Sequence, residues 1–293
     1  YICTNAPHGP FHCPQKYLDM YKGQSGRIAS FFGMITNIDD NVGQTRALLK
    51  KLGIHDDTIF IFTTDNGTAS GREIFNAGMR GQKGSEYDGG HRVPFFLHWP
   101  KGGMDKKHVV DTLCHAVDVA PTLLDLTLDQ GCADLVEPIE GRSLTGLMSG
   151  NTDSWADETR AEILFEGVNA PGLMIRRGAR KYVHWEGLPC SLFDLGSDPS
   201  EMNNLVDDPA HADEVAAFEN QVQHDWPLEE LTERVLLKQR RNALVHRALM
   251  TGQRTPFDFQ PFDDASKRFY RGHGNWHEAE ARDFLRFDAA KDD

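Results

Sequence analysis

The sequence has 293 residues, of which 39% are hydrophobic and 26% charged, as in an ordinary globular protein. This composition excludes disorder, collagen and coiled coil as descriptions of the whole chain. With 31 basic and 44 acidic residues the formal net charge is −13, so the chain repels phosphate backbones and nucleic-acid binding is not expected. No apolar run approaches the roughly 20 residues of a transmembrane helix, and the five cysteines form no CxxC pair.

The first part of the chain has the pattern of an α/β fold. Apolar residues recur at helical spacing over Arg27–Leu52, and Gly53 follows as a stop signal. The apolar, β-branched run Asp57–Thr64 predicts a strand buried on both faces, as in a parallel sheet. A second strand is predicted over Val93–Trp99 and a short helix over Val117–Leu126. In such folds the chemistry lies at the carboxyl ends of the strands.

Beyond about residue 131 the pattern changes to short strands. These are predicted over Ala161–Glu166, Leu173–Arg177, Lys181–Trp185 and Ser191–Asp194. A helix is predicted over Ala212–Gln223, and a charged amphipathic helix over Leu228–Met250 precedes an aromatic tail. We therefore expect three parts: an α/β part over residues 1–130, a smaller α+β subdomain with an antiparallel sheet over 131–226, and a helical, aromatic tail over 227–293.

Asp65 and Asn66 directly follow the first predicted strand. A carboxylate and an amide oxygen at this position suit a hard cation such as Ca²⁺ or Mg²⁺. The alternative is a structural turn, because Asn-Gly is the commonest hairpin signal. The dipeptide alone leaves both interpretations open, although no alternating partner strand follows immediately.

A glycine-rich segment, Asn76–Pro94, is the most informative stretch. Its glycines allow the backbone to approach a ligand closely, and Lys83 places a compact positive charge there that suits an oxyanion. By itself this Lys is also compatible with a solvated surface loop.

His8 lies in a Pro-Gly turn after the extended start Tyr1–Asn5, which has the character of the end of a buried strand. It could protonate a leaving group, or it could be a structural His.

Taken together and in this order, these pieces resemble the type I sulfatases, the formylglycine-dependent sulfate-ester hydrolases of the alkaline-phosphatase superfamily. The resemblance covers roughly two-thirds of the chain and is more specific than any single motif. The matching segments are Asn5–Pro14, Ile35–Gly43, Thr63–Gly67, Gly78–Pro94, His115–Leu124 and Leu192–Leu205.

The resemblance implies an alkaline-phosphatase-like α/β/α sandwich, of which residues 1–130 would be the C-terminal half. It also implies roles for individual residues. Asp65 and Asn66 match the second pair of metal ligands, usually for Ca²⁺, with Mg²⁺ as a possibility. Lys83 matches the lysine that holds a sulfate oxygen, and His8 matches the histidine near the sulfate and its leaving-group oxygen. Two further residues flank this pocket as candidates for substrate contact, Arg80 and His91.

One essential part of the family pattern is absent from the sequence. The family's nucleophile is a formylglycine made from Cys or Ser in a Cys/Ser-x-Pro-x-Arg motif, and these 293 residues contain neither that motif nor the first pair of metal-binding aspartates. We therefore expect the chain to be the C-terminal part of a sulfatase and to be inactive alone. The full-length parent protein would be the enzyme that releases inorganic sulfate from a small organic sulfate ester or a sulfated glycan.

The C-terminal region resembles the choline-sulfatase branch, whereas the segment around Lys83 resembles arylsulfatases. The resemblance implies oligomer contacts through the tail, whose aromatics could bind a quaternary ammonium or simply pack on the body. These aromatics are Phe257, Phe259, Phe262 and Trp276. Arylsulfatase-like proteins would be periplasmic or secreted, and choline-sulfatase-like proteins cytoplasmic, so the compartment stays open.

Two alternatives remain open at the level of the sequence. The first is a phosphate- or phosphonate-ester hydrolase of the same superfamily, with similar metal chemistry and a different nucleophile. The second is a non-catalytic metal-binding or assembly protein. The missing nucleophile is what this second alternative predicts, but the joint presence of four matching residues argues against it: His8, Asp65, Asn66 and Lys83.

Overall fold

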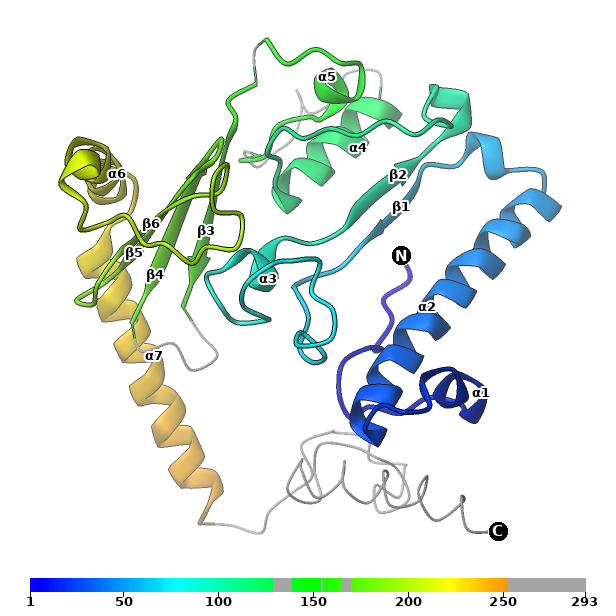
Figure 1. Ribbon diagram of the computed structural model, residues 1–293, viewed down its shortest axis with the longest axis horizontal. Coiled ribbons are helices and arrows are strands. Elements are labelled where there is room, and N and C mark those ends of the chain that lie inside the picture. The colour runs from blue at the N-terminus through cyan, green and yellow to red at the C-terminus, as the bar shows by residue number, and fades with distance from the viewer. Residues whose placement is uncertain (129–138, 154, 165–169, 252–293) are drawn as a thin grey trace. The chain divides into compact units, whose positions relative to one another are not determined.

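The computed structural model describes residues 1–128, 139–153, 155–164 and 170–251 (Figure 1). By its contacts the chain divides into two units. The first comprises residues 1–76, 93–105 and those from 237 onward, and the second comprises 77–92 and 106–236. None of the described helices is long and apolar enough to cross a membrane. The four tail aromatics named above lie outside the described residues.

The first unit is built on one long helix. Its elements are α1 (Gln15–Leu18), η1 (Asp19–Tyr21), α2 (Gly26–Lys51), η2 (His55–Asp57), β1 (Phe60–Thr63), β2 (Phe95–His98) and η3 (Pro100–Gly102). The predicted stop at Gly53 is confirmed, since its φ of 72° is in the left-handed region. The Gly53 N–H donates to Lys50 O at 3.0 Å, and the Ile54 N–H donates to Leu49 O at 3.1 Å. This Schellman pattern satisfies the last carbonyls of the helix.

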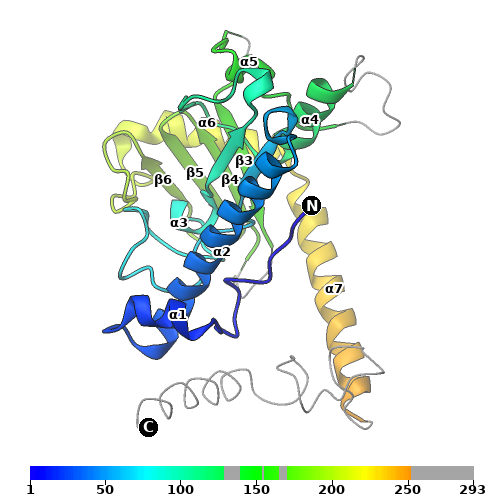
Figure 2. The ribbon, with the colours of Figure 1, turned by 90° about the vertical axis from the view of Figure 1, so that its right-hand side faces the viewer.

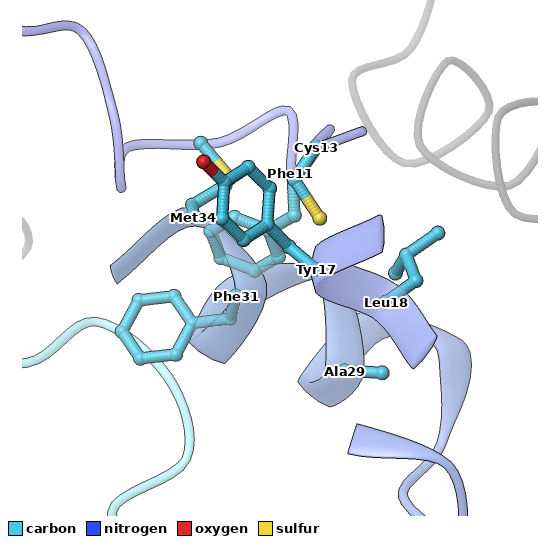
Figure 3. Close-up of a cluster of buried hydrophobic side chains, with 7 residues drawn as sticks. All are labelled: Phe11, Cys13, Tyr17, Leu18, Ala29, Phe31 and Met34. Carbon is cyan, nitrogen blue, oxygen red and sulfur yellow. The ribbon is translucent and has the colours of Figure 1, made fainter. Parts of the chain in front are cut away.

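Side chains from α1, α2 and the preceding segment form a small apolar core (Figure 3). Phe11 and Phe31 meet edge to face with ring centroids 5.3 Å apart, and Cys13 and Met34 fill the same cluster. The Tyr17 ring is buried here while its hydroxyl donates to Asp40 Oδ2 at 2.8 Å. Burial of these rings fixes α1 against α2 because their apolar surface leaves water.

The strand predicted over Asp57–Thr64 is present as β1, but its expected parallel, doubly buried setting is wrong. Within the described residues β1 pairs antiparallel with β2, in the register Phe60↔His98, and its side chains are half-buried or exposed. An apolar run identifies a strand but not its partner's direction, and the long connection between β1 and β2 permits either. The buried strand end expected at Tyr1–Asn5 is also wrong, because this segment is exposed and pairs with no strand in the part of the chain that the structure describes.

The second unit carries a four-stranded antiparallel sheet, which confirms the predicted α+β character. Its elements are α3 (Asp88–His91), η4 (Ala116–Asp118), α4 (Val119–Thr127), α5 (Thr145–Met148), β3 (Glu158–Ile163), β4 (Gly172–Arg177), β5 (Arg180–Trp185), β6 (Ser191–Asp194), η5 (Pro209–His211) and α6 (Ala212–Asp225). The strand order is β3-β4-β5-β6, each antiparallel to its neighbour. A further helix, α7 (Leu228–Leu249), begins in this unit and ends in the first.

Both faces of β5 are covered, because four consecutive residues from Lys181 to His184 are buried. On one face Tyr182 stacks on Phe218 of α6 with centroids 5.5 Å apart, inside an apolar cluster that includes Ile175 and Leu192. Figures 1 and 2 show α6 beside the sheet. Lys181 points to the opposite face, since side chains alternate along a strand.

The apolar core of the first unit yields a stability prediction. Phe31→Ala should lower the free energy of unfolding by about 3–5 kcal/mol, because it removes a ring that is 3% exposed and leaves a cavity. Urea titration followed by circular dichroism measures this change. Phe75→Ala is the matched control, since that ring is 70% exposed and should cost little. Equal effects of the two variants would contradict the assignment of the core.

Candidate active site: a lysine turn held by a buried ionic cluster

Lys83 lies in a tight turn within the glycine-rich segment. The Ser85 N–H donates to Gln82 O at 3.0 Å, so Lys83 and Gly84 are the two central residues of the turn. Gly84 has a φ of 81°, which a turn with a positive φ at its third residue requires. The Ser85 hydroxyl donates to Gln82 O at 2.8 Å and accepts from the Gln82 N–H at 3.1 Å. Lys83 is therefore presented on a closed turn, half-buried, rather than on an open loop.

The end of this turn is tied to the sheet of the second unit by a buried ionic cluster. The Lys181 ammonium of β5, fully buried, donates to Asp88 Oδ1 at 3.1 Å and to Glu201 Oε1 at 2.6 Å. Arg176, the neighbour of Lys181 on β4, donates to Asp88 Oδ2 at 3.2 Å. The Asp88 N–H donates to Glu201 Oε2 at 2.7 Å. Two carboxylates thus share one site with Lys181 and Arg176 on the face of β5 opposite α6, and the more exposed Arg92 lies 3.6 Å from Asp88 Oδ2.

The same cluster determines the charge states of its members. Burial alone would raise the pKa of Asp88, but the charges of Lys181 and Arg176 outweigh it and hold that pKa below its ordinary value. Burial raises the pKa of Glu201, and Lys181 only partly opposes this effect. Asp88 is therefore the carboxylate that both cations keep ionised. Buried charges of this kind are tolerated only when they are paired and hydrogen-bonded.

Arg80 and His91, the two candidate substrate contacts, take part in this anchoring. The Arg80 guanidinium donates to the backbone carbonyl of Glu201 and lies over the Tyr87 ring, 3.9 Å from its centroid. His91 Nε2 lies 3.2 Å from Glu86 O, to which it can donate, and 3.9 Å from an Asp88 carboxylate oxygen. Burial, together with the nearby Lys181 charge, lowers the pKa of His91 to about 4. His91 is thus neutral at pH 7.

The remaining predicted site residues belong to the first unit. Asp65 and Asn66 directly follow β1, and the Thr64 hydroxyl donates to Asn66 O at 3.1 Å. The hairpin alternative is wrong, since the partner of β1 is the distant β2 rather than a strand after Gly67. His8 is exposed, and its Nδ1 lies 2.9 Å from Gly9 O. A carbonyl oxygen only accepts, so the His8 tautomer that makes this contact carries its proton on Nδ1.

The donor set at Asp65 and Asn66 fits a hard cation. Among the described residues the Asp65 carboxylate is exposed and has no hydrogen-bond or ion-pair partner, so its oxygens are available as ligands. Asn66 contributes an amide oxygen at the adjacent position, and oxygen ligands suit Ca²⁺ or Mg²⁺. The structure thus gathers Arg80, Lys83 and His91 in one segment of the second unit. His8, Asp65 and Asn66 lie in the first unit.

Sequence reasoning missed the residues that hold the turn, namely Asp88, Lys181 and Glu201. A signal existed for Lys181, because a charged residue inside an apolar strand must be paired if it is buried. No comparable signal marked Glu201. It lies in the irregular segment after β6 with a φ of 54°, and only the folded chain brings it to Lys181.

Comparison with known proteins defines the class of this chain. Residues 1–129 match the model of the family described as Sulfatase. Residues 82–226 match the N-sulphoglucosamine sulphohydrolase C-terminal model, and residues 233–287 match the model described as Choline sulfatase enzyme C terminal. Together these matches cover nearly the whole sequence, and all three are sulfatase models.

Individual relatives agree with these matches. A choline-sulfatase of Rhizobium meliloti (strain 1021) is 32% identical over 84% of this chain and 46% of its own length. The solved structure of Ps i-CgsB in complex with k-i-k-neocarrahexaose is 24% identical with a TM-score of 0.62, covering 75% of this chain and 47% of that one. Phosphonate monoester hydrolase of Agrobacterium radiobacter is 28% identical with a TM-score of 0.54, covering 68% and 40%.

These similarities define an α/β protein with the alkaline-phosphatase-like fold, which confirms the predicted fold class. The chain belongs to the sulfatase family of the alkaline-phosphatase superfamily, and its C-terminal region is of the choline-sulfatase type. It spans about half the length of the relatives described above.

The buried cluster predicts a large cost for removing Lys181. Lys181→Met should lower the free energy of unfolding by about 3–5 kcal/mol, because Glu201 loses its cation while remaining buried. Lys101→Met is the matched control: its ion pair with Asp57 is equally short, 2.7 Å, but both side chains are more than 60% exposed. It should cost less than about 1 kcal/mol. Similar urea midpoints for the two variants would show that the cluster does not stabilise the fold.

His91 predicts an acid-dependent loss of stability. Its pKa is about 4 in the folded chain and 6.5 as an unperturbed His, so between these pH values only the unfolded chain binds the proton. The free energy of unfolding should therefore fall as pH drops from about 6.5 to about 4, by up to about 3 kcal/mol from this group. His91→Gln should flatten this decline in urea titrations, whereas His246→Gln, an exposed control, should not. An unchanged slope in His91→Gln would contradict the assignment.

Proposed function

We propose that this chain contributes sulfate-binding and metal-binding residues to a sulfuric ester hydrolase that releases inorganic sulfate from a small organic sulfate ester or a sulfated glycan. The observation that supports this proposal most is the closed turn around Lys83, fixed to the sheet through Asp88 and Lys181. A rigidly placed ammonium stabilises an oxyanion without reorganisation at the moment of reaction. Family membership makes sulfate the expected oxyanion.

Each proposed role follows from the chemistry of the side chain. The Lys83 ammonium would neutralise charge on a sulfate oxygen, as a compact cation does. His8, whose Nδ1 contacts Gly9 O, would donate from Nε2 to the leaving-group oxygen when protonated. Arg80 and His91 would border the substrate, and their contacts with Glu201 and Glu86 support a fixed position for both.

The metal is proposed to be Ca²⁺, with Mg²⁺ as the alternative, held by Asp65 and Asn66. When bound, such a cation supplies positive charge that stabilises the sulfate oxygens. The formylglycine nucleophile of the family has no counterpart in these 293 residues, which lack a Cys/Ser-x-Pro-x-Arg motif. We therefore propose that the chain by itself does not hydrolyse sulfate esters. Sulfate release by the isolated 293-residue chain would refute this part of the proposal.

The domain boundaries and the tail are proposals of the same kind. The family matches that end at residue 129 and begin at 233 support a division into residues 1–130, 131–226 and 227–293. As the resemblance implies, we also propose that the choline-sulfatase-type tail takes part in oligomer contacts. Gel filtration of the chain with and without residues 252–293 would test that role, and an unchanged elution state would remove it.

A phosphonate or phosphate monoester hydrolase is the second candidate function. The similarity to the phosphonate monoester hydrolase of Agrobacterium radiobacter, with 28% identity and a TM-score of 0.54, favours it. Parallel assays with 4-nitrophenyl sulfate and 4-nitrophenyl phenylphosphonate, on protein expressed from the complete gene, separate the two functions. Turnover of neither ester would favour the non-catalytic, metal-binding alternative.

Lys83 provides the decisive variant for the active protein. Lys83→Ala should lower kcat/KM for the sulfate ester by at least about 100-fold, because the site loses one preorganised group for the oxyanion. The control is Lys107→Ala, which removes an exposed ammonium of the same unit and should leave kcat/KM unchanged. An unchanged kcat/KM in Lys83→Ala would remove Lys83 from the sulfate site.

A further inference from the structure

The face of β5 opposite Lys181 carries a second cluster of chemically reactive side chains. His184 of β5, Cys190 before β6 and Glu219 of α6 each direct one potential ligand atom to a common point, and these atoms lie within 4.8 Å of one another. Neither the lysine turn nor Asp65 and Asn66 take part in this cluster. Imidazole, thiol and carboxylate are the three ligand types that zinc binds in proteins.

The separations in this cluster are close to those of a tetrahedral metal site. His184 Nδ1 lies 2.9 Å from Glu219 Oε2 and 3.8 Å from Cys190 Sγ. Bond lengths of about 2.0–2.3 Å at a tetrahedral angle place ligand atoms roughly 3.3–3.8 Å apart. The third separation, between Cys190 Sγ and the Glu219 carboxylate, is at most 4.8 Å, so shifts of about an ångström would complete the coordination. The His184 side chain is buried, at 9% exposure, whereas the Glu219 side chain is 35% exposed. Solvent can therefore reach the site from the Glu219 side.

A second set of hydrogen bonds surrounds these atoms in the manner of a metal site. The other His184 nitrogen, Nε2, lies 3.3 Å from Glu186 Oε2, which forms a carboxylate–histidine pair on the far side of the imidazole. The Glu219 carboxylate accepts from Gln223 Nε2 at 2.9 Å and from the Tyr182 hydroxyl at 2.7 Å. These contacts orient the His and the carboxylate toward the shared point, as outer partners do around bound metals.

A purely structural hydrogen-bond cluster holds the thiol only by weak contacts. Cys190 Sγ lies 3.8 Å from His184 Nδ1 and 3.9 Å from Leu188 O, and the Tyr182 hydroxyl also interacts with this thiol. A thiol is a weak donor and acceptor, so such contacts contribute little. A thiolate bound to a metal is a strong ligand, and this role gives Cys190 a reason to face the His and the Glu.

We propose that His184, Cys190 and Glu219 form a binding site for a divalent transition metal, Zn²⁺ by preference, with a fourth position open to water. A thiolate and an imidazole select a borderline-soft ion and disfavour Ca²⁺ and Mg²⁺, which bind oxygen ligands. Binding forms a metal–sulfur bond and releases the Cys190 proton to solvent. The His184 imidazole is then neutral, with its proton on Nε2 where Glu186 accepts it. The ion would join β5, the β5–β6 connection and α6.

The test adds Co²⁺ to the full 293-residue chain with its thiols kept reduced. Wild-type chain should show thiolate-to-cobalt charge-transfer absorption that saturates at one equivalent and that Zn²⁺ abolishes by displacement. Cys190→Ser should lose the band, while Cys3→Ser and Cys114→Ser, two exposed thiols, should keep it. Glu186→Gln should bind about 10–100-fold more weakly, since it loses the outer partner of His184.

Two further measurements keep the outcome unambiguous. Zn²⁺ should raise the Tm of the wild type and leave the Tm of Cys190→Ser unchanged, while the two proteins have the same circular dichroism without metal. Asp65→Ala should keep the cobalt band, which separates this site from the proposed Ca²⁺ site. No band at one equivalent, or a band that survives Cys190→Ser, would overturn the proposal and leave a hydrogen-bond cluster. Sulfate-ester turnover would be unaffected by either result.

Discussion

The ion pairs of Lys181 are the interactions on which the second unit depends. A lysine with no solvent exposure requires compensating charge, and the chain supplies it from two distant places, Asp88 and Glu201. Asp88 lies in the glycine-rich segment, three residues after the turn that carries Lys83, so neutralising Lys181 also holds this turn close to the sheet. The pairing of one buried charge thereby holds the glycine-rich segment in a defined conformation.

A single strand organises two chemically different faces. On one face of β5 the ionic cluster holds the lysine turn. On the other, Tyr182 and the apolar residues of β4 and β6 pack against α6, and His184 directs its ring nitrogens to Glu186 and Glu219. β5 tolerates a buried lysine because Asp88 and Glu201 pair with it on one face, and a buried tyrosine because apolar side chains cover its ring on the other. The separation of these two faces explains why two separate sites can lie within one small sheet.

The proposed sulfatase residues divide between the two units in a way that follows from their local setting. Asp65 and Asn66 lie at the end of a strand, where a short polar loop can offer oxygen ligands. Lys83 lies on a turn that needs glycine in the left-handed region. Cation ligands and an oxyanion-binding ammonium thus come from different kinds of local structure. The order of motifs along the chain, rather than any one motif, carries the family assignment.

Features that depend on neighbouring residues could be predicted from the sequence: the helix stop at Gly53, the strands β4 to β6, and the family pattern around His8, Asp65 and Lys83. Three features appear only in the folded chain: the antiparallel pairing of β1 with β2, the contact of Glu201 with Lys181, and the convergence of His184, Cys190 and Glu219. Periodicity and turn chemistry encode local conformation and which face is apolar. Partners far apart in the chain are selected by packing and by the cost of unpaired buried charge, which no local pattern records.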